Sequence, residues 1–199
     1  EWSREQRAQA ALGWGLAAYR FDRYKRSNGN NGQPGGKSNG APKALLVLDA
    51  DIEDEVRALL AAQTLVRDLV NTPTEHLGPG ELADAVTRVA DACEAESEVV
   101  SGEELLTRNF PAVHAVGRAS SRPPRLVELR WGDAEAPLVA LVGKGVCFDT
   151  GGLDLKTSSG MALMKKDMGG AAHALALAQL VMQHALPVRL LLLIPAVEN

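Results

Sequence analysis

The chain has 199 residues, of which 46% are hydrophobic and 23% are charged, as in folded globular proteins rather than disordered ones. Only 4% are aromatic, so aliphatic side chains must fill the core. The net charge is −4, but residues 1–43 carry eight basic and three acidic residues. We interpret this basic excess as solubilising surface charge, which argues against a nucleic-acid partner.

The chain carries no pattern of an exported or membrane-spanning protein. Two cysteines, Cys93 and Cys147, are too few for a disulfide framework. The first four residues, EWSR, are polar, unlike the start of a signal peptide. The longest apolar run near the C-terminus, 190–197, is too short to cross a bilayer. We therefore expect a cytoplasmic chain without a membrane partner.

The first elements in chain order are a helix and a loop. Ser3 and Gln6 form a capping-box pattern, followed by apolar residues at helical spacing. Residues 27–43 hold five Gly, four Asn and two Pro, a composition that predicts a mobile loop. Its flanks, 19–25 and 44–48, are candidate strands of a hairpin.

An acidic run at residues 49–55 precedes a second helical pattern that extends to Val70. Carboxylates at a helix N-terminus complement the helix dipole, and the run lacks the spacing of a calcium loop, so we favour a helix start. The sequence Asn-Thr-Pro at 71–73 ends this helix, and another is predicted from Glu81 to about Ala95.

Short apolar segments then alternate with helical ones. The predicted strands are 99–100, 112–116, 126–131, 138–143 and 188–194, and the predicted helices are 103–108 and 169–185. Such apolar runs are typical of strands buried on both faces by helices. The predicted fold class is therefore α/β, with a mixed, largely parallel sheet flanked by helices.

Residues 143–156, GKGVCFDTGGLDLK, follow a predicted strand, and in α/β sheets ligands bind at the carboxyl ends of strands. The stretch does not match a phosphate loop, a dinucleotide fingerprint or a serine nucleophile elbow. Hard divalent cations prefer carboxylate oxygen, so a metal site competes with a solvated loop held by structural ion pairs. The candidate charged residues are Lys144, Asp149, Asp154, Lys156 and Asp167.

Three other groups carry weaker signals. The histidines have no zinc-binding spacing, and those in the predicted helix are interpreted as surface residues. Cys147 is interpreted as a packing residue rather than a nucleophile. Met161, Met164 and Met168 fit a substrate pocket and a packed helical face equally well. The four histidines are His76, His114, His173 and His184.

The stretch from Val142 to Ala172 resembles the leucyl aminopeptidase (cytosol aminopeptidase) family of dinuclear metallopeptidases. The family's core pattern is present here as VGKGVCFDTGG, then a lysine, then MALMKKDMGGAA. Upstream segments are similar in family order. These segments are RDLVNTP at 67–73, PGELA at 79–83, AVGRAS at 115–120 and PPRL at 123–126.

The resemblance implies a division of the chain into three parts. Residues 1–51 are similar to the tail of a smaller N-terminal α/β domain, here with the flexible loop 27–43. Residues 52–70 correspond to a connecting helix, and residues 71–199 to the first part of a catalytic metallopeptidase domain. We therefore expect the chain to begin inside one domain and to stop partway through another.

Carried over position by position, the resemblance implies that Lys144, Asp149 and Asp167 are metal ligands, with Asp149 bridging two divalent ions, Mn²⁺ or Zn²⁺. Lys156 matches the catalytic lysine that binds substrate and stabilises the oxyanion. Met164 matches a residue lining the pocket for the first side chain. The implied enzyme is a metallo-aminopeptidase, a hydrolase that removes leucine-like N-terminal residues from peptides through a metal-bridging hydroxide.

Some positions depart from the family pattern, namely Cys147, Thr150, Thr157 and Ala162, but none matches a ligand. The family's second motif, NTDAEGRL, does not occur in the sequence. That motif supplies the remaining carboxylate ligands and an arginine that holds a bicarbonate acting as base. Activity is therefore expected to require ligands beyond residue 199, and the 199-residue chain alone to be inactive.

The resemblance also implies peptide substrates and assembly into a homo-oligomer, a hexamer. The alternative interpretation is a non-catalytic fragment or paralogue that keeps the fold as a binding or assembly subunit.

Overall fold

The computed structural model describes residues 1–25 and 48–199. The loop predicted at 27–43 and nearly all of its second flank lie outside the described residues. The strand predicted at 19–25 is wrong. This segment is irregular and ends in a turn, where the amide of Lys25 donates to the carbonyl of Asp22 at 3.1 Å. An ion pair between the two side chains at 2.6 Å reinforces the turn, so the local pairing replaces strand pairing.

The described residues form two compact units, Glu1–Thr64 and Leu65–Asn199, and their boundary falls within helix α2 (Glu53–Asn71). Helix α2 matches the helix predicted at 52–70. The assignment of residues 1–51 to a separate domain stays a prediction. No helix in the described part of the chain is long and apolar enough to cross a membrane.

The first unit is built around helix α1 (Arg4–Ala18) and the start of α2. The predicted capping box is confirmed, because Ser3 Oγ accepts from the amide of Gln6 at 3.2 Å and Gln6 Oε1 accepts from the amide of Ser3 at 2.9 Å. The buried apolar residues of this unit are Ala8, Ala11, Ile52 and Val56.

The acidic run before α2 is engaged by arginines of α1. Arg7 contacts Asp49 at 2.8 Å and Asp51 at 2.7 Å, and Arg4 contacts Glu55 at 2.9 Å. These exposed pairs, and the acidic residues in the first turn of α2, account for the run without a calcium ion.

The second unit holds the remaining elements. They are η1 (Thr74–His76), α3 (Pro79–Ala92), β1 (Glu96–Ser101), α4 (Glu104–Thr107), α5 (Pro111–Gly117), β2 (Arg125–Trp131), β3 (Leu138–Val142), β4 (Gly145–Phe148), α6 (Ser158–Met161), η2 (Met164–Met168), α7 (Gly169–Gln183) and β5 (Arg189–Glu198). The strand predicted at 112–116 is wrong, because this segment is helix α5. Pro111 occupies its first turn, where the fixed φ of proline favours a helix.

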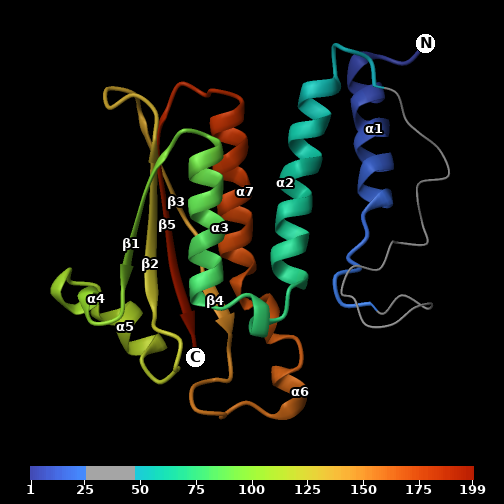
Figure 1. The fold of residues 1–199 in the computed structure, drawn as a ribbon. Coiled ribbons are helices and arrows are strands. Elements are labelled where there is room, and N and C mark those ends of the chain that lie inside the picture. The colour runs from blue at the N-terminus through green and yellow to red at the C-terminus, as the bar shows by residue number, and fades with distance from the viewer. Residues whose placement is uncertain (26–47) are drawn as a thin grey trace, which may run out of the picture. The chain divides into compact units, whose positions relative to one another are not determined.

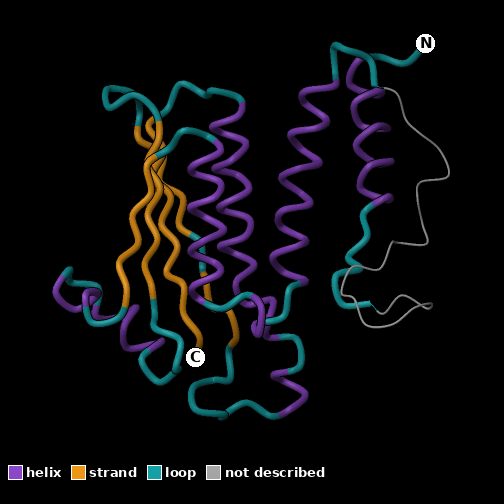
Figure 2. The backbone as a smooth tube through the Cα atoms, viewed as in Figure 1, coloured by secondary structure: helices purple, strands orange, loops and turns teal. Residues whose placement is uncertain are grey.

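The five strands form one mixed sheet in the order β1-β2-β5-β3, with β4 also paired to β5 (Figure 2). Strands β3 and β4 run parallel to β5, whereas β2 runs antiparallel to both β1 and β5. The α/β class with a mixed sheet flanked by helices is confirmed. Among the described strands, antiparallel pairings are as frequent as parallel ones, so the sheet is less parallel than expected.

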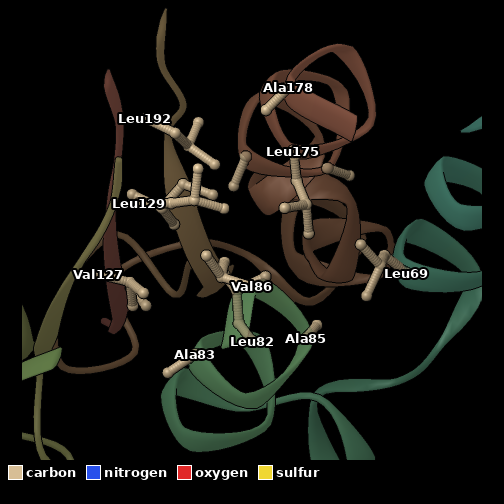
Figure 3. Close-up of a cluster of buried hydrophobic side chains, with 14 of the residues drawn as sticks. Leu69, Leu82, Ala83, Ala85, Val86, Val127, Leu129, Leu175, Ala178 and Leu192 are labelled. Carbon is tan, nitrogen blue, oxygen red and sulfur yellow. The ribbon is translucent and has the colours of Figure 1, made fainter. Parts of the chain in front are cut away.

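Helices α3 and α7 cover one face of this sheet (Figure 1). Along β5 the residues facing them are buried, while Leu191 and Leu193, which alternate with them, are only partly buried. For β5, the predicted burial on both faces is therefore found on the face toward α3 and α7, whereas the opposite face is only partly buried. The core contains Leu82 and Val86 of α3, Leu175 and Ala178 of α7, and Val127, Leu129 and Leu192 of the sheet (Figure 3). Full burial of such a leucine contributes about 1.5–3 kcal/mol.

Strands β3 and β4 lie end to end along β5 and are separated by Gly143 and Lys144. Val142 pairs with Leu193 of β5, and the next pair along the strand is Gly145 with Ala196. Between these positions β5 holds Pro195, which has no N–H to donate to a neighbouring strand. The carbonyl of Lys144 instead accepts from the amide of Ala171 in α7 at 2.9 Å. The interruption therefore ties the lysine position to the start of α7.

Gly143 permits this close approach of α7. A Cβ added at Gly143 would lie 2.6 Å from the Cα of Ala171 and 2.9 Å from the carbonyl oxygen of Gly170. Both are backbone atoms that cannot rotate away. In contrast, a Cβ added at Gly13 in α1 would meet no atom within 4 Å.

We therefore expect Gly143→Ala to lower the free energy of unfolding by about 1–3 kcal/mol, because the added methyl group overpacks the junction. Gly13→Ala is the matched control and should raise it by about 0.5–1 kcal/mol, since alanine favours a helix interior. Urea denaturation of the two variants measures both changes. Equal stability of the two variants would contradict the packing role of Gly143.

Candidate metal and active site

The residues proposed from sequence come together around β4. Lys144 directly precedes this strand, and Asp149 directly follows it. Met164 and Asp167 belong to η2, which packs against β4. Lys156 lies in the loop between β4 and α6. The local chain path, a strand followed by a tight loop and a short helical segment, thus folds the whole motif onto one strand.

Two ion pairs join these residues. The Nζ atom of Lys144 lies 2.7 Å from Asp167 Oδ2, and the Nζ atom of Lys156 lies 2.6 Å from Asp149 Oδ2. The carboxylates are the less exposed partners, at 15% and 18%, whereas the Lys144 side chain is 59% exposed. Each partly buried carboxylate is therefore neutralised by its own lysine.

The carboxylate of Asp149 is fixed by three donors. Its Oδ1 atom accepts from the amide of Gly151 at 2.7 Å and from Asn199 Nδ2 at 3.2 Å, and its Oδ2 atom accepts from Lys156. The hydrogen bond from Lys156 is the main cause that lowers the pKa of Asp149. Burial opposes it, while the Gly151 amide and the charges of Lys156 and Lys144 add to it. The group is held as an anion.

A left-handed turn returns the chain from Asp149 to Lys156. Residues 151–154 all have positive φ, including Leu153 at 50° and Asp154 at 64°. The turn closes where the amide of Lys156 donates to the carbonyl of Thr150 at 2.7 Å. Asp154 is exposed and its amide donates to Thr150 Oγ1 at 3.1 Å. Asp154 is therefore part of the turn, and it takes part in neither the Lys144–Asp167 nor the Lys156–Asp149 ion pair.

The three methionines of the motif do different things. Met168 is fully buried in the core, whereas Met161 is only partly buried. Met164 Sδ accepts a hydrogen bond from Lys156 Nζ at 3.3 Å. The segment changes from α6 to η2 between them, so the methionines do not form one packed helical face. Of the three, Met164 is the one in contact with the candidate site.

The donor set fits a divalent cation. Lys144 Nζ and Asp167 Oδ2 can reach one ion together, because donors bound at about 2.0–2.2 Å lie about 3 Å apart around it. The buried Asp167 Oδ2 receives no hydrogen bond of good geometry from the described residues, and Lys144 contacts it as an ion pair only. Within residues 1–25 and 48–199, no three His, Cys, Asp or Glu side chains form a metal-binding group. The candidate metal ligands among the described residues are thus the carboxylates of Asp149 and Asp167 and the amine of Lys144.

Cys147 is a packing residue, as predicted. Its side chain is buried in the core, and burial is the main cause that raises its pKa to about 12. A thiol with this pKa stays protonated near neutral pH and is a poor nucleophile. The histidines of α7 also fit the surface interpretation. His173 Nδ1 lies 2.7 Å from the carbonyl of Gly169, and His184 is exposed at the end of the helix.

Sequence reasoning missed Asn199. Its main chain extends the pairing of β5 with β4, because its amide donates to Phe148 at 3.0 Å and its carbonyl accepts from Thr150 at 2.9 Å. These bonds place its side chain beside Asp149. The available signal was a polar residue at the carboxyl end of a long apolar strand, where α/β sheets bind ligands.

Arg122 fixes the end of β5 next to Asn199. Its guanidinium pairs with Glu198 and donates to the carbonyl of Thr74 at 2.6 Å. Burial opposes the charged form, but the hydrogen bond and charge of Glu198 raise the pKa of Arg122 overall. The pair therefore anchors β5 to the segment before α3.

A cavity of about 590 Å³ lies at the amino end of β5. It is lined by Trp131, Arg130 and Arg189, among others, and by none of the candidate site residues. We therefore do not assign the candidate chemistry to this cavity.

The chain is similar to known proteins over nearly its whole length. Residues 64–199 match the family model described as "Cytosol aminopeptidase family, catalytic domain". A probable cytosol aminopeptidase of Rhodococcus jostii (strain RHA1) is 36% identical, over 96% of this chain and 39% of its own length.

Two solved structures are similar over most of the chain. The crystal structure of cytosol aminopeptidase from Coxiella burnetii is 51% identical with a TM-score of 0.86, over 98% of this chain and 40% of its own. The bottromycin maturation enzyme BotP in complex with Mn is 34% identical with a TM-score of 0.82, over the same shares. The chain thus spans about two fifths of the length of these proteins.

The burial of Cys147 predicts slow reaction with thiol reagents. In a Cys93→Ala variant, Cys147 should react with 5,5′-dithiobis(2-nitrobenzoate) only after unfolding in urea. The matched Cys147→Ala variant leaves the less buried Cys93, which should react faster in the folded protein. Absorbance at pH 7.5 measures both rates, and rapid reaction of folded Cys147 would restore the nucleophile interpretation.

Proposed function

The chain belongs to the cytosol aminopeptidase family, and from this premise we propose that it forms part of the metal site of an aminopeptidase that removes leucine-like N-terminal residues from peptides. One observation carries the proposal. Two lysine–carboxylate pairs, Lys144 with Asp167 and Lys156 with Asp149, converge around β4 in a catalytic-domain segment. Isolated structural ion pairs would not require both carboxylates to be partly buried beside one short strand.

In the proposed site, Lys144, Asp149 and Asp167 would hold the divalent metal ions. Mn²⁺ is supported by the related BotP, which was solved in complex with Mn, and Zn²⁺ also accepts these donors. When bound, the ions would supply a hydroxide nucleophile at neutral pH and polarise the scissile carbonyl. Among the described residues, the proposed ligands include only two carboxylates, Asp149 and Asp167, so we propose that further ligands come from outside residues 1–199.

Lys144 and Asp167 prepare the site for a cation. A lysine binds a metal only as the neutral amine, so its proton must leave when the ion arrives. The 59% exposure of the Lys144 side chain gives that proton a route to water. Asp167 holds the lysine nitrogen in place, at 2.7 Å, before the exchange.

Lys156 is the proposed catalytic residue. Its ammonium has three N–H groups, of which one faces Asp149 Oδ2 and another faces Met164 Sδ. Among the described residues, these two contacts leave one N–H of Lys156 for the carbonyl oxygen of a substrate. A fixed cation at that place would stabilise the negative charge that develops on the oxygen during hydrolysis.

Met164 contacts the proposed catalytic lysine and is the residue proposed to contact the first side chain of the substrate. Its thioether accepts from Lys156, so the rest of its flexible apolar side chain lies next to the proposed reaction centre. We propose that it lines the pocket for the first side chain of the peptide, which favours an aliphatic residue such as leucine. A cytosolic location, a bound bicarbonate and a hexameric assembly complete the proposal by family analogy.

The full-length protein should hydrolyse leucine-p-nitroanilide with Mn²⁺ or Zn²⁺ and lose this activity in excess EDTA. Addition of the metal after removal of the chelator should restore turnover. The 199-residue chain alone should not turn over the substrate with either metal. Inactivity of the full-length protein with both ions would overturn the enzyme proposal. Activity of the short chain would overturn the need for further ligands.

We expect Lys156→Met to slow kcat by about 100–1000-fold, the usual loss for one oxyanion donor. Its affinity for Mn²⁺ should not weaken, because the substitution removes a cation that competes for Asp149. Lys166→Met, at an exposed lysine of η2, is the matched control and should retain activity. Calorimetric titration of Mn²⁺ and steady-state kinetics separate the two effects. An equal loss of metal affinity and kcat would contradict the oxyanion role.

A further inference from the structure

We propose that Asn199 is a positioning residue that orients the carboxylate of Asp149 for cation binding. The inference rests on the proposed function, because it takes Asp149 to be a metal ligand. It assigns a role to a side chain that lies 50 positions away in sequence and has no place among the donors predicted above.

The two oxygens of Asp149 have different surroundings. Oδ2 faces the ammonium of Lys156 at 2.6 Å, a charged group that competes with a cation. Oδ1 is held by two neutral donors, the amide of Gly151 at 2.7 Å and Asn199 Nδ2 at 3.2 Å. Neutral donors fix the carboxylate plane without adding a charge that repels a cation. The neutral donors at Oδ1 thus orient the carboxylate of Asp149, whereas Lys156 at Oδ2 balances its negative charge.

The main chain of Asn199 holds residues on both sides of Asp149. Its amide donates to the carbonyl of Phe148 at 3.0 Å, and its carbonyl accepts from the amide of Thr150 at 2.9 Å. Its Cα position is therefore set by the β4–β5 register, in which Phe148 pairs with Glu198. The side chain starts from a fixed point and needs to order only its two torsions to reach Asp149.

The amide of Asn199 has one productive orientation. A carboxylate only accepts hydrogen bonds, so the NH₂ end must face Asp149. The Oδ1 end then faces the left-handed turn, where a Cβ added at Gly152 would lie 3.3 Å from it. The side chain thus fills the space between the ligand carboxylate and the turn that carries Lys156.

The side chain and the main chain of Asn199 can be tested separately. Asn199→Leu keeps the size of the side chain and both main-chain hydrogen bonds but removes the donor to Asp149. In the full-length protein, we expect the Kd for Mn²⁺ to rise at least about 10-fold, as for other groups that orient metal ligands. Isothermal titration calorimetry measures the Kd, and the electron paramagnetic resonance spectrum of bound Mn²⁺ should change with the altered ligand orientation.

Glu198→Gln is the matched control. It weakens the pair with Arg122 at the neighbouring residue of the same strand, so it should lower the melting temperature while leaving the Kd for Mn²⁺ unchanged. If Asn199→Leu does not fold, Asn199→Ala removes the same donor without filling the space.

The outcomes separate the two proposals. If the unsubstituted protein binds Mn²⁺ and the Asn199 variant binds it equally tightly, the positioning role is overturned and the proposed function stands. If Glu198→Gln weakens Mn²⁺ binding as much as the Asn199 variant does, the effect belongs to the strand end and the positioning role is again overturned. If the unsubstituted full-length protein binds no Mn²⁺, the proposed function fails, and this inference fails with it.

Discussion

The parallel pairing of β4 with the last residues of β5 is the contact on which the candidate site depends. It places Asp149 and Asn199 side by side at the carboxyl ends of neighbouring strands. The same strand β5 carries Pro195, opposite the interruption that releases Lys144 from the ladder toward α7. A single ten-residue strand therefore helps to position the carboxylate of Asp149, the amine of Lys144 and the side-chain amide of Asn199.

Charge balance explains how the candidate site accommodates two partly buried carboxylates. Two partly buried carboxylates in one place would repel each other and lose hydration, so each is paired with a lysine. The lysines then differ in what they do next. In the proposed function, Lys144 would give up its proton to hold the metal ion, whereas Lys156 would keep its charge and face the substrate. The same electrostatic requirement thus places both the proposed ligand lysine and the proposed catalytic lysine.

Long periodic segments such as α2, α7 and β5 could be predicted from sequence, because many residues report the same period. The helix α5, of which the five residues 112–116 were predicted as a strand, and the four-residue strand β4 could not be predicted. Alternation of apolar residues over so few positions fits a helix and a strand equally well. For the site, the clustering of Lys144, Asp149 and Lys156 in sequence indicated a shared location. It did not indicate which lysine pairs with which carboxylate. The contribution of Asn199 depends on a strand register that no local pattern contains.

The turn at residues 151–154 gives the site an unusual relation to the handedness of the chain. Glycines at 151 and 152 adopt left-handed backbone freely, but Leu153 and Asp154 hold it at a cost of roughly 1–3 kcal/mol each. A mirror-image residue at either position would follow the same path without strain. The ion pair between Lys156 and Asp149 therefore joins the two ends of a backbone stretch that L-residues rarely adopt, and the proposed catalytic lysine follows a strained turn rather than a relaxed loop.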